Sequence, residues 1–172
     1  MDLSVKIKEL GLKVRPTVSP ENVREFEARL GVNLPEEYVL FVTEIGDGWE
    51  KQVVRRRLWQ EMKSMVSHED MSVLCKPFPY TEAWVWEGRE TNPLPGECDE
   101  AWNKRVDELL RPKSFGNIPL MRGSHGEVFH LILNGKCSGE IWEFTDVGIA
   151  PCAPRVTFLE WITAWIESKS PV

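Results

Sequence analysis

Apolar residues recur at helical spacing near the start of the chain. Val23, Phe26 and Leu30 are three and four positions apart, as the buried stripe of a helix requires. Ser19-Pro20-Glu21 before them supplies an N-cap, a first-turn proline and an acid that complements the helix dipole. Gly31 can adopt the left-handed conformation that closes a helix. The pattern therefore predicts a helix from Pro20 to Leu30.

A second helical stripe runs from Tyr38 to Ile45. Pro35 suits its first position, because a missing N–H costs nothing there, and Gly46 stands where a closing glycine is expected. The run Gly46-Asp47-Gly48 could also hold a ligand, but neither a phosphate-binding motif nor a set of calcium-binding oxygens accompanies it. The residues favour helix termination.

The middle of the chain, from Lys51 to Leu74, fits two interpretations. Val53-Val54 and Ser72-Val73-Leu74 could be short strands. The helical alternative uses one apolar face, made of Val54, Leu58, Met62, Met65 and Val66. Both interpretations stay open.

Strand patterns lie in the second half of the chain. Aromatic and β-branched residues predict an extended strand over Ala83–Trp86. Val128–Leu133 and Glu140–Phe144 predict two further strands joined by a glycine-bearing turn.

Two more helices are predicted around these strands. Asp99 marks the N-cap of one, which ends before Pro112. Its inward positions are Trp102, Val106, Leu109 and Leu110. Thr157–Glu160 forms a capping box that opens the last helix. Together these elements predict a single α+β domain over residues 1–172, with a mainly antiparallel sheet flanked by helices.

Charge and composition narrow the function classes. The 172 residues carry a formal net charge of −6, which argues against nonspecific binding of nucleic acid or anionic membrane and suits a basic protein partner. No apolar run approaches the ~20 residues of a membrane span, and the N-terminus has no signal-peptide core. We expect a soluble cytoplasmic protein whose thiols are reduced.

Candidate chemistry is sparse in this sequence. His125, His130, Cys137 and Cys152 lack the short paired spacings of a zinc site, so no metal or cofactor is predicted. Cys137 or Ser124 could be a nucleophile beside His125 or His130, but Gly123–Gly126 is no nucleophile elbow. We therefore predict no catalytic residues.

One basic run and one acidic segment are candidate binding surfaces. Arg55-Arg56-Arg57 could meet phosphate, but on an acidic chain such a run is more often a solvated face. Residues 82–100 contain six acids and one arginine around Trp84 and Trp86, whose indoles would share one face of a strand. These indoles could belong to the core or anchor a basic partner. The predicted partner surface comprises Asp47, Trp49, Glu87, Glu90, Glu97 and Asp99.

The motif F-E-x-x-L-G-V-x-L-P-E-E-Y-x-x-F, here residues 26–41, resembles the N-terminal signature of the SMI1/KNR4 family, also called the SUKH superfamily. Gly139–Trp142 and Thr157–Ile162 are similar to its C-terminal half. The stop at Ile45–Gly48 departs from the usual Asn-Gly, and the longer middle predicts a family-specific insert around 77–113.

The resemblance implies a non-catalytic α+β fold whose bacterial members bind and neutralise toxins, many of them nucleases, as immunity proteins of polymorphic toxin systems. We accordingly expect a protein that occludes a basic toxin domain. Two alternatives remain open: an intracellular scaffold or regulatory protein of the fungal type without a toxin partner, and, more remotely, a small hydrolase with a Cys or Ser nucleophile.

Overall fold

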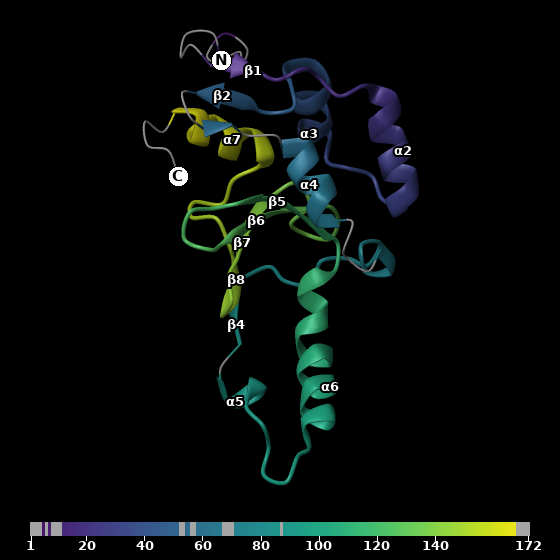
Figure 1. Cartoon of the computed structure of the whole chain (residues 1–172), viewed down its shortest axis with the longest axis vertical. Helices are drawn as coiled ribbons and strands as arrows, with labels where there is room; N and C mark the ends of the chain where they lie inside the picture. The colour runs from purple at the N-terminus through teal and green to yellow at the C-terminus, as the bar shows by residue number, and fades with distance from the viewer. Residues whose placement is uncertain are drawn as a thin grey trace.

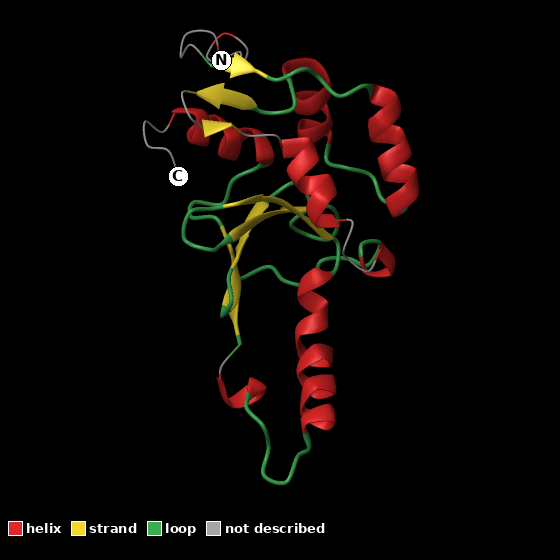
Figure 2. Cartoon of the chain, in the orientation of Figure 1, coloured by secondary structure: helices red, strands yellow, loops and turns green. Residues whose placement is uncertain are grey.

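The structure is a computed structural model that describes residues 5, 7, 12–51, 54–55, 58–66, 71–86 and 88–167. Figure 1 shows an elongated molecule, with both termini near one end and helix α6 at the other. Within the described residues, helices flank two antiparallel sheets (Figure 2), which confirms the predicted α+β class.

The first half of the chain builds a small sheet and most of the helices that cover the core. Its order is β1 (Lys13–Val14), α2 (Pro20–Leu30), α3 (Glu36–Leu40), the π-helical turn η1 (Phe41–Ile45), β2 (Trp49–Lys51), β3 (Val54–Arg55), α4 (Leu58–Val66) and the 3-10 turn η2 (Met71–Val73). The strands β1, β2 and β3 pair in that order, antiparallel throughout.

The second half builds the main sheet and ends in a helix. Its order is β4 (Trp84–Val85), α5 (Gly88–Thr91), α6 (Asp99–Leu110), the 3-10 turn η3 (Arg111–Ser114), β5 (Asn117–Arg122), β6 (Val128–Ile132), β7 (Ile141–Phe144), β8 (Gly148–Pro151) and α7 (Phe158–Glu167). The sheet has the strand order β4-β8-β7-β6-β5, with antiparallel pairing throughout. The predicted pairing of two strands in this region is confirmed by β6 and β7.

Helix α2 begins and ends as predicted. The hydroxyl of Ser19 accepts the N–H of Asn22 at 3.2 Å. Gly31 has a φ of 69°, and its N–H donates to the carbonyl of Glu27 at 2.8 Å, which closes the helix. The capping box at the last helix is also present in part, because the N–H of Thr157 donates to the carboxylate of Glu160 at 2.9 Å.

Gly46 ends the helical run of α3 and η1, as predicted. Its N–H donates to the carbonyl of Phe41 at 2.9 Å. A Cβ at this position would collide with the backbone carbonyl of Arg15, so only glycine lets the two chain segments approach this closely.

Both interpretations of the middle segment hold in part. Val54 lies in β3, while Leu58, Met62 and Val66 form the buried face of α4. The predicted strand over Ser72–Leu74 is wrong, because η2 occupies Met71–Val73.

The two faces of the main sheet are covered very differently. Leu131 and Ile141 belong to the larger hydrophobic cluster, which the helices α2, α3, α4 and α7 also enter. Their neighbours Ile132 and Trp142 point to the opposite face, as strand alternation requires. That second face carries a smaller cluster, covered by the segment from Phe78 to Trp86. We call everything except residues 88–110 the body.

Residues 88–110 form a projection that we call the arm. Figure 1 shows α5 and α6 extending side by side away from the body, joined by a loop at the far end. None of the described α6 side chains is fully buried, although Trp102, Val106, Leu109 and Leu110 are half-buried. The helix starts one residue earlier than expected, at Asp99, because Cys98 and not Asp99 is its N-cap. The arm lies within residues 77–113, where the sequence predicts an insert; that it is an insert stays a prediction.

Candidate functional site

The arm folds back on itself through a tight turn. The N–H of Glu97 donates to the carbonyl of Leu94 at 3.0 Å, with Pro95 and Gly96 at the two central positions. Gly96 has a φ of 81°, which a type II turn requires and glycine permits. The turn reverses the chain, so that α6 runs back toward the body beside α5.

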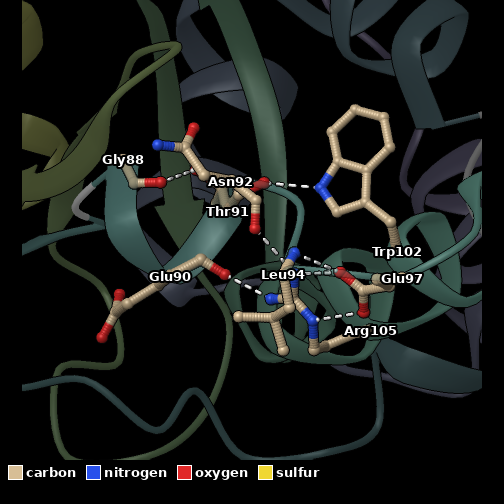
Figure 3. Close-up of polar contacts among 8 residues, drawn as sticks. All are labelled: Gly88, Glu90, Thr91, Asn92, Leu94, Glu97, Trp102 and Arg105. Carbon is tan, nitrogen blue, oxygen red and sulfur yellow. Dashed lines mark hydrogen bonds and ion pairs between the residues drawn. The ribbon is translucent and has the colours of Figure 1, made fainter.

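Arg105 fastens the arm from the middle of α6. Its Nε and Nη2 donate to the two carboxylate oxygens of Glu97, at 2.9 and 2.8 Å, in a bidentate pair. Nη1 donates to the carbonyl of Glu90 at 2.6 Å, and Nη2 also reaches the carbonyl of Asn92 at 2.8 Å. Figure 3 shows these bonds converging on one guanidinium. A single side chain therefore connects α6 to both α5 and the loop.

Two further bonds complete this network. The indole N–H of Trp102 donates to the carbonyl of Thr91 at 2.6 Å, one helical turn before Arg105 (Figure 3). The carboxylate of Glu97 also accepts the N–H of Leu94 at 2.9 Å. The bonds from Arg105, followed by that N–H, lower the pKa of Glu97 to about 2, and the Glu97 carboxylate raises the pKa of Arg105. The ion pair is thus complete at neutral pH.

The outside of the arm is acidic, and Leu94 is a large exposed apolar side chain on its described part. Leu94 is 51% exposed at the turn. The exposed carboxylates on the described part of the arm are Glu90, Asp99, Glu100, Asp107 and Glu108. Lys104 is an exposed cation among them. The surface therefore combines a projecting apolar tip with negative charge, on a backbone that internal hydrogen bonds hold in place.

Two residues predicted to touch a partner are buried, and we remove them from that surface. Asp47 is only 6% exposed, and its carboxylate accepts the N–H of Trp59 at 2.5 Å in the first turn of α4. A carboxylate there satisfies a free helix amide and complements the helix dipole. Trp49 is 4% exposed and packs edge-on against Trp165, with 4.7 Å between ring centroids. Both residues stabilise the body.

The remaining predicted partner residues lie on or beside the arm. Glu90 and Asp99 are exposed. Glu97 has a side chain only 11% exposed and bonded to Arg105, so its role is to hold the arm together. Glu87 lies outside the described residues, as do Arg56 and Arg57.

Sequence reasoning missed Arg105 and Leu94. A signal for the first was present, because Arg105 lies three residues after Trp102 and four before Leu109, on the predicted apolar stripe. A charged residue at such a position needs a partner, and Glu97 was the nearby acid in the loop.

Trp84 and Trp86 support the arm where it leaves the body. Their rings lie 5.3 Å apart on one side of β4, and Trp84 also stacks on Tyr80 at 5.1 Å. The ammonium of Lys113 lies 4.6 Å from the ring of Trp86. Both indoles are half-buried against the smaller hydrophobic cluster, so they belong mainly to the body.

The nucleophile candidates do not assemble into a relay. Ser124 Oγ lies 3.0 Å from Nδ1 of His125, and the same nitrogen is the one 4.0 Å from Glu127. A relay needs the base and its orienting carboxylate on opposite ring nitrogens. The His125 side chain is 89% exposed. Burial raises the pKa of the Cys137 thiol, which disfavours its nucleophilic thiolate form.

The described residues contain neither a candidate metal site nor a membrane-spanning helix. No group of three or more His, Cys, Asp or Glu side chains is close enough there to hold a metal ion. None of the described helices combines the length and apolar character needed to cross a bilayer.

The comparisons with known proteins add no relative. No protein-family model matches the chain, and searches of curated proteins and of solved structures found no match either. The resemblance to the SMI1/KNR4 family therefore stays a prediction from the sequence.

Proposed function

We propose that this protein is a non-catalytic binding module of the immunity type, which uses its arm to occlude the active site or substrate groove of a basic toxin, such as a nuclease. The observation that carries the proposal is the arm itself. It presents Leu94 and several carboxylates on a projecting scaffold that Arg105 and Trp102 hold in place.

A preordered projection suits occlusion for an energetic reason. Binding costs free energy when loops and side chains lose freedom at the interface. In the arm, the carbonyls of Glu90, Thr91 and Asn92 are already bonded to α6, so much of that ordering is complete before a partner arrives. Leu94 at the turn can then act as an apolar anchor surrounded by charge.

The charge of the arm supports a basic partner. Nucleases and other proteins that bind anionic substrates present positive clefts, and opposite charge speeds their encounter with an acidic surface. Exposed Glu90, Asp99 and Glu100 provide such charge near the end of the arm. The resemblance to SMI1/KNR4 proteins points to the same class of function.

The test is a binding experiment with the toxin encoded beside this gene. The double variant E90Q/D99N removes two charges from the arm, and E25Q/E44Q removes two exposed charges from the body as a matched control. At low salt we expect the arm variant to associate on the order of tenfold more slowly than the control variant, with the difference shrinking as salt is added.

Two results would contradict the proposal. Equal slowing of both variants would show that only net charge matters and that the arm is not the docking surface. Failure to bind or neutralise the toxin, together with stable complexes with housekeeping proteins, would favour the scaffold alternative.

A further inference from the structure

A pocket of about 330 Å³, with mainly apolar walls, opens on the second face of the main sheet, where the arm joins the body. Its walls include Pro119 of β5, Val128 of β6 and Phe144 of β7. Lys113 of η3, the turn that continues directly from α6, lies at the pocket as well. The pocket is therefore within reach of a partner that is held on the arm.

Asn117 and His130 form a directed hydrogen-bond chain in this pocket. The amide Nδ2 of Asn117 donates to the backbone carbonyls of Lys113 and Phe115, at 2.8 and 2.9 Å. Both hydrogens of the amide are thus used, and its orientation is determined. Its Oδ1 lies 2.7 Å from Nδ1 of His130 and can only accept, so Nδ1 must carry the proton. In a neutral ring this leaves Nε2 as a bare acceptor.

The environment of His130 keeps the ring neutral. Burial, followed by the nearby Lys113 ammonium, lowers its pKa to about 3. The ring lies flat against that of Phe144, with 3.7 Å between centroids and 14° between planes. Within the part of the chain that the structure describes, no hydrogen bond to Nε2 is present. The lone pair of Nε2 is the polar feature that a ligand would have to satisfy.

The chemistry of the walls selects the occupant. A ligand must donate a hydrogen bond to Nε2, and a carboxylate would bring its own lone pairs against it. The lining carries one cation, Lys113, and one carboxylate, Asp146, so a charged side chain gains no net attraction there to offset the loss of its hydration. The volume is about twice that of a cavity of ~150 Å³ that binds benzene, so the pocket has room for an aromatic ring.

We infer that this pocket binds the side chain of a tyrosine of the protein partner, with the ring packed on Val128 and the phenol O–H donating to Nε2 of His130. The inference rests on the proposed function, because it identifies a second contact made by the partner on the arm. Tyrosine also suits such a site because it combines a rigid apolar ring with a polar tip and is enriched at binding hot spots.

The test uses the free protein with p-cresol, which reproduces the tyrosine side chain, and toluene, which lacks the hydroxyl. Titrations followed by NMR of the histidine rings should show p-cresol binding with a Kd on the order of 1 mM. Toluene should bind at least about fivefold more weakly, because it leaves the Nε2 acceptor unsatisfied. The p-cresol shifts should appear on His130 and be absent from exposed His125. Equal affinities, or p-cresol shifts that spare His130, would overturn the inference.

Two variants keep the test decisive if one of them fails to fold. His130→Phe retains a ring but removes the acceptor, and the preference for p-cresol over toluene should disappear. Val128→Phe leaves His130 intact and fills the pocket, so both probes should lose affinity. Unchanged preference in the first variant, or unchanged binding in a folded second variant, would contradict the pocket assignment.

Binding of p-cresol can be tested independently of the proposed function. The small probes need no protein partner, so p-cresol binding can succeed even if the toxin does not bind. E90Q/D99N, which alters the arm, should leave p-cresol affinity unchanged. Loss of p-cresol affinity in that variant would show that the pocket depends on the arm charges and would overturn the inference as stated.

Discussion

The body and the arm are ordered by different interactions. The body completely buries large side chains such as Tyr38, Phe41 and Phe158, on a sheet face covered by helices. The arm depends instead on hydrogen bonds from Arg105 and Trp102 to backbone carbonyls, and its exposed fraction is much larger. Burial of apolar surface is the main source of stability, whereas hydrogen bonds mainly determine geometry.

The difference explains how one chain can combine a stable domain with a projecting surface. Body mutations should lower the free energy of global unfolding, since they remove apolar contacts. Arm mutations should loosen the arm locally and leave global unfolding nearly unchanged, because local opening of a weakly buried segment does not require the core to unfold. Mutations in each region test this division.

The largest loss of stability is expected on mutation of Phe158. Its ring is fully buried and meets Tyr38 and Phe41 edge-on, at centroid distances of 5.1 and 5.5 Å. Phe158→Ala should lower the free energy of unfolding by about 3–5 kcal/mol, as removal of a buried aromatic ring does. Urea denaturation measures this value. Local hydrogen exchange in residues 90–97 should stay as in the original protein, and faster local exchange there would break the proposed separation.

The next largest effect is a dependence of the free energy of unfolding on pH, caused by His130 in the body. The folded-state pKa of His130 is about 3, below the ordinary value of 6.5, so the unfolded chain takes up a proton first as the pH falls. The free energy of unfolding should therefore decrease from pH 6.5 toward pH 3, by at most about 1.4 kcal/mol per pH unit from this group.

Urea denaturation at several pH values tests that slope. His130→Phe should flatten it between pH 6.5 and pH 4, while His125→Gln, which changes an exposed histidine, should not. A slope that persists in His130→Phe would assign the acid sensitivity to other groups.

The sequence predicted the body better than the arm, for a physical reason. Caps and periodic apolar residues are local signals, and α2 and the pairing of β6 with β7 follow from them. The burial of Asp47 and Trp49 depends on contacts with Trp59 and Trp165, which are far away in the sequence. Local composition marked both residues as surface features, and only the tertiary structure shows what covers them.

The arm shows a different limit of sequence reasoning. The acidic composition around Trp84 and Trp86 predicted a partner surface there, and it did locate the exposed carboxylates Glu90 and Asp99. It could not distinguish them from Glu97, because the same residue type is a structural ligand of Arg105. A carboxylate is structural when a cation of the same chain faces it, and exposed otherwise. The number of charges in a segment does not show which of the two applies.

Arg105→Met tests whether the arm depends on its guanidinium. The variant keeps an apolar stem but loses the bonds to Glu97 and to the carbonyls of Glu90 and Asn92. Amide exchange in residues 90–97 should accelerate roughly tenfold or more, while the urea midpoint changes little. Lys104→Met, on the same helix but exposed, is the matched control. Similar exchange rates in both variants would mean that other contacts order the arm.

Acidification should release the same contact without a mutation. The pKa of Glu97 is about 2 in the folded arm and ordinarily near 4.5, so its stabilising contribution is complete above pH 4.5 and is lost as the pH falls through about 2. Exchange at the Leu94 amide, which donates to Glu97, should therefore accelerate between these values. The His130 effect begins at higher pH but overlaps this window between about pH 4.5 and 3, so the readout distinguishes the two regions: global unfolding reports His130 and exchange at the Leu94 amide reports Glu97.

The smallest effect on stability is expected at Leu94. Its side chain is 51% exposed at the end of the arm, so Leu94→Ala should change the free energy of unfolding by no more than about 0.5 kcal/mol. Arm exchange should also stay unchanged, because its backbone N–H and not its side chain bonds to Glu97. A single exposed leucine is common on protein surfaces, so the binding role of Leu94 rests on the proposed function of the arm. Leu94→Ala should therefore accelerate dissociation of the partner while urea denaturation is unaffected; a loss of stability instead would show that the leucine belongs to the arm's own packing.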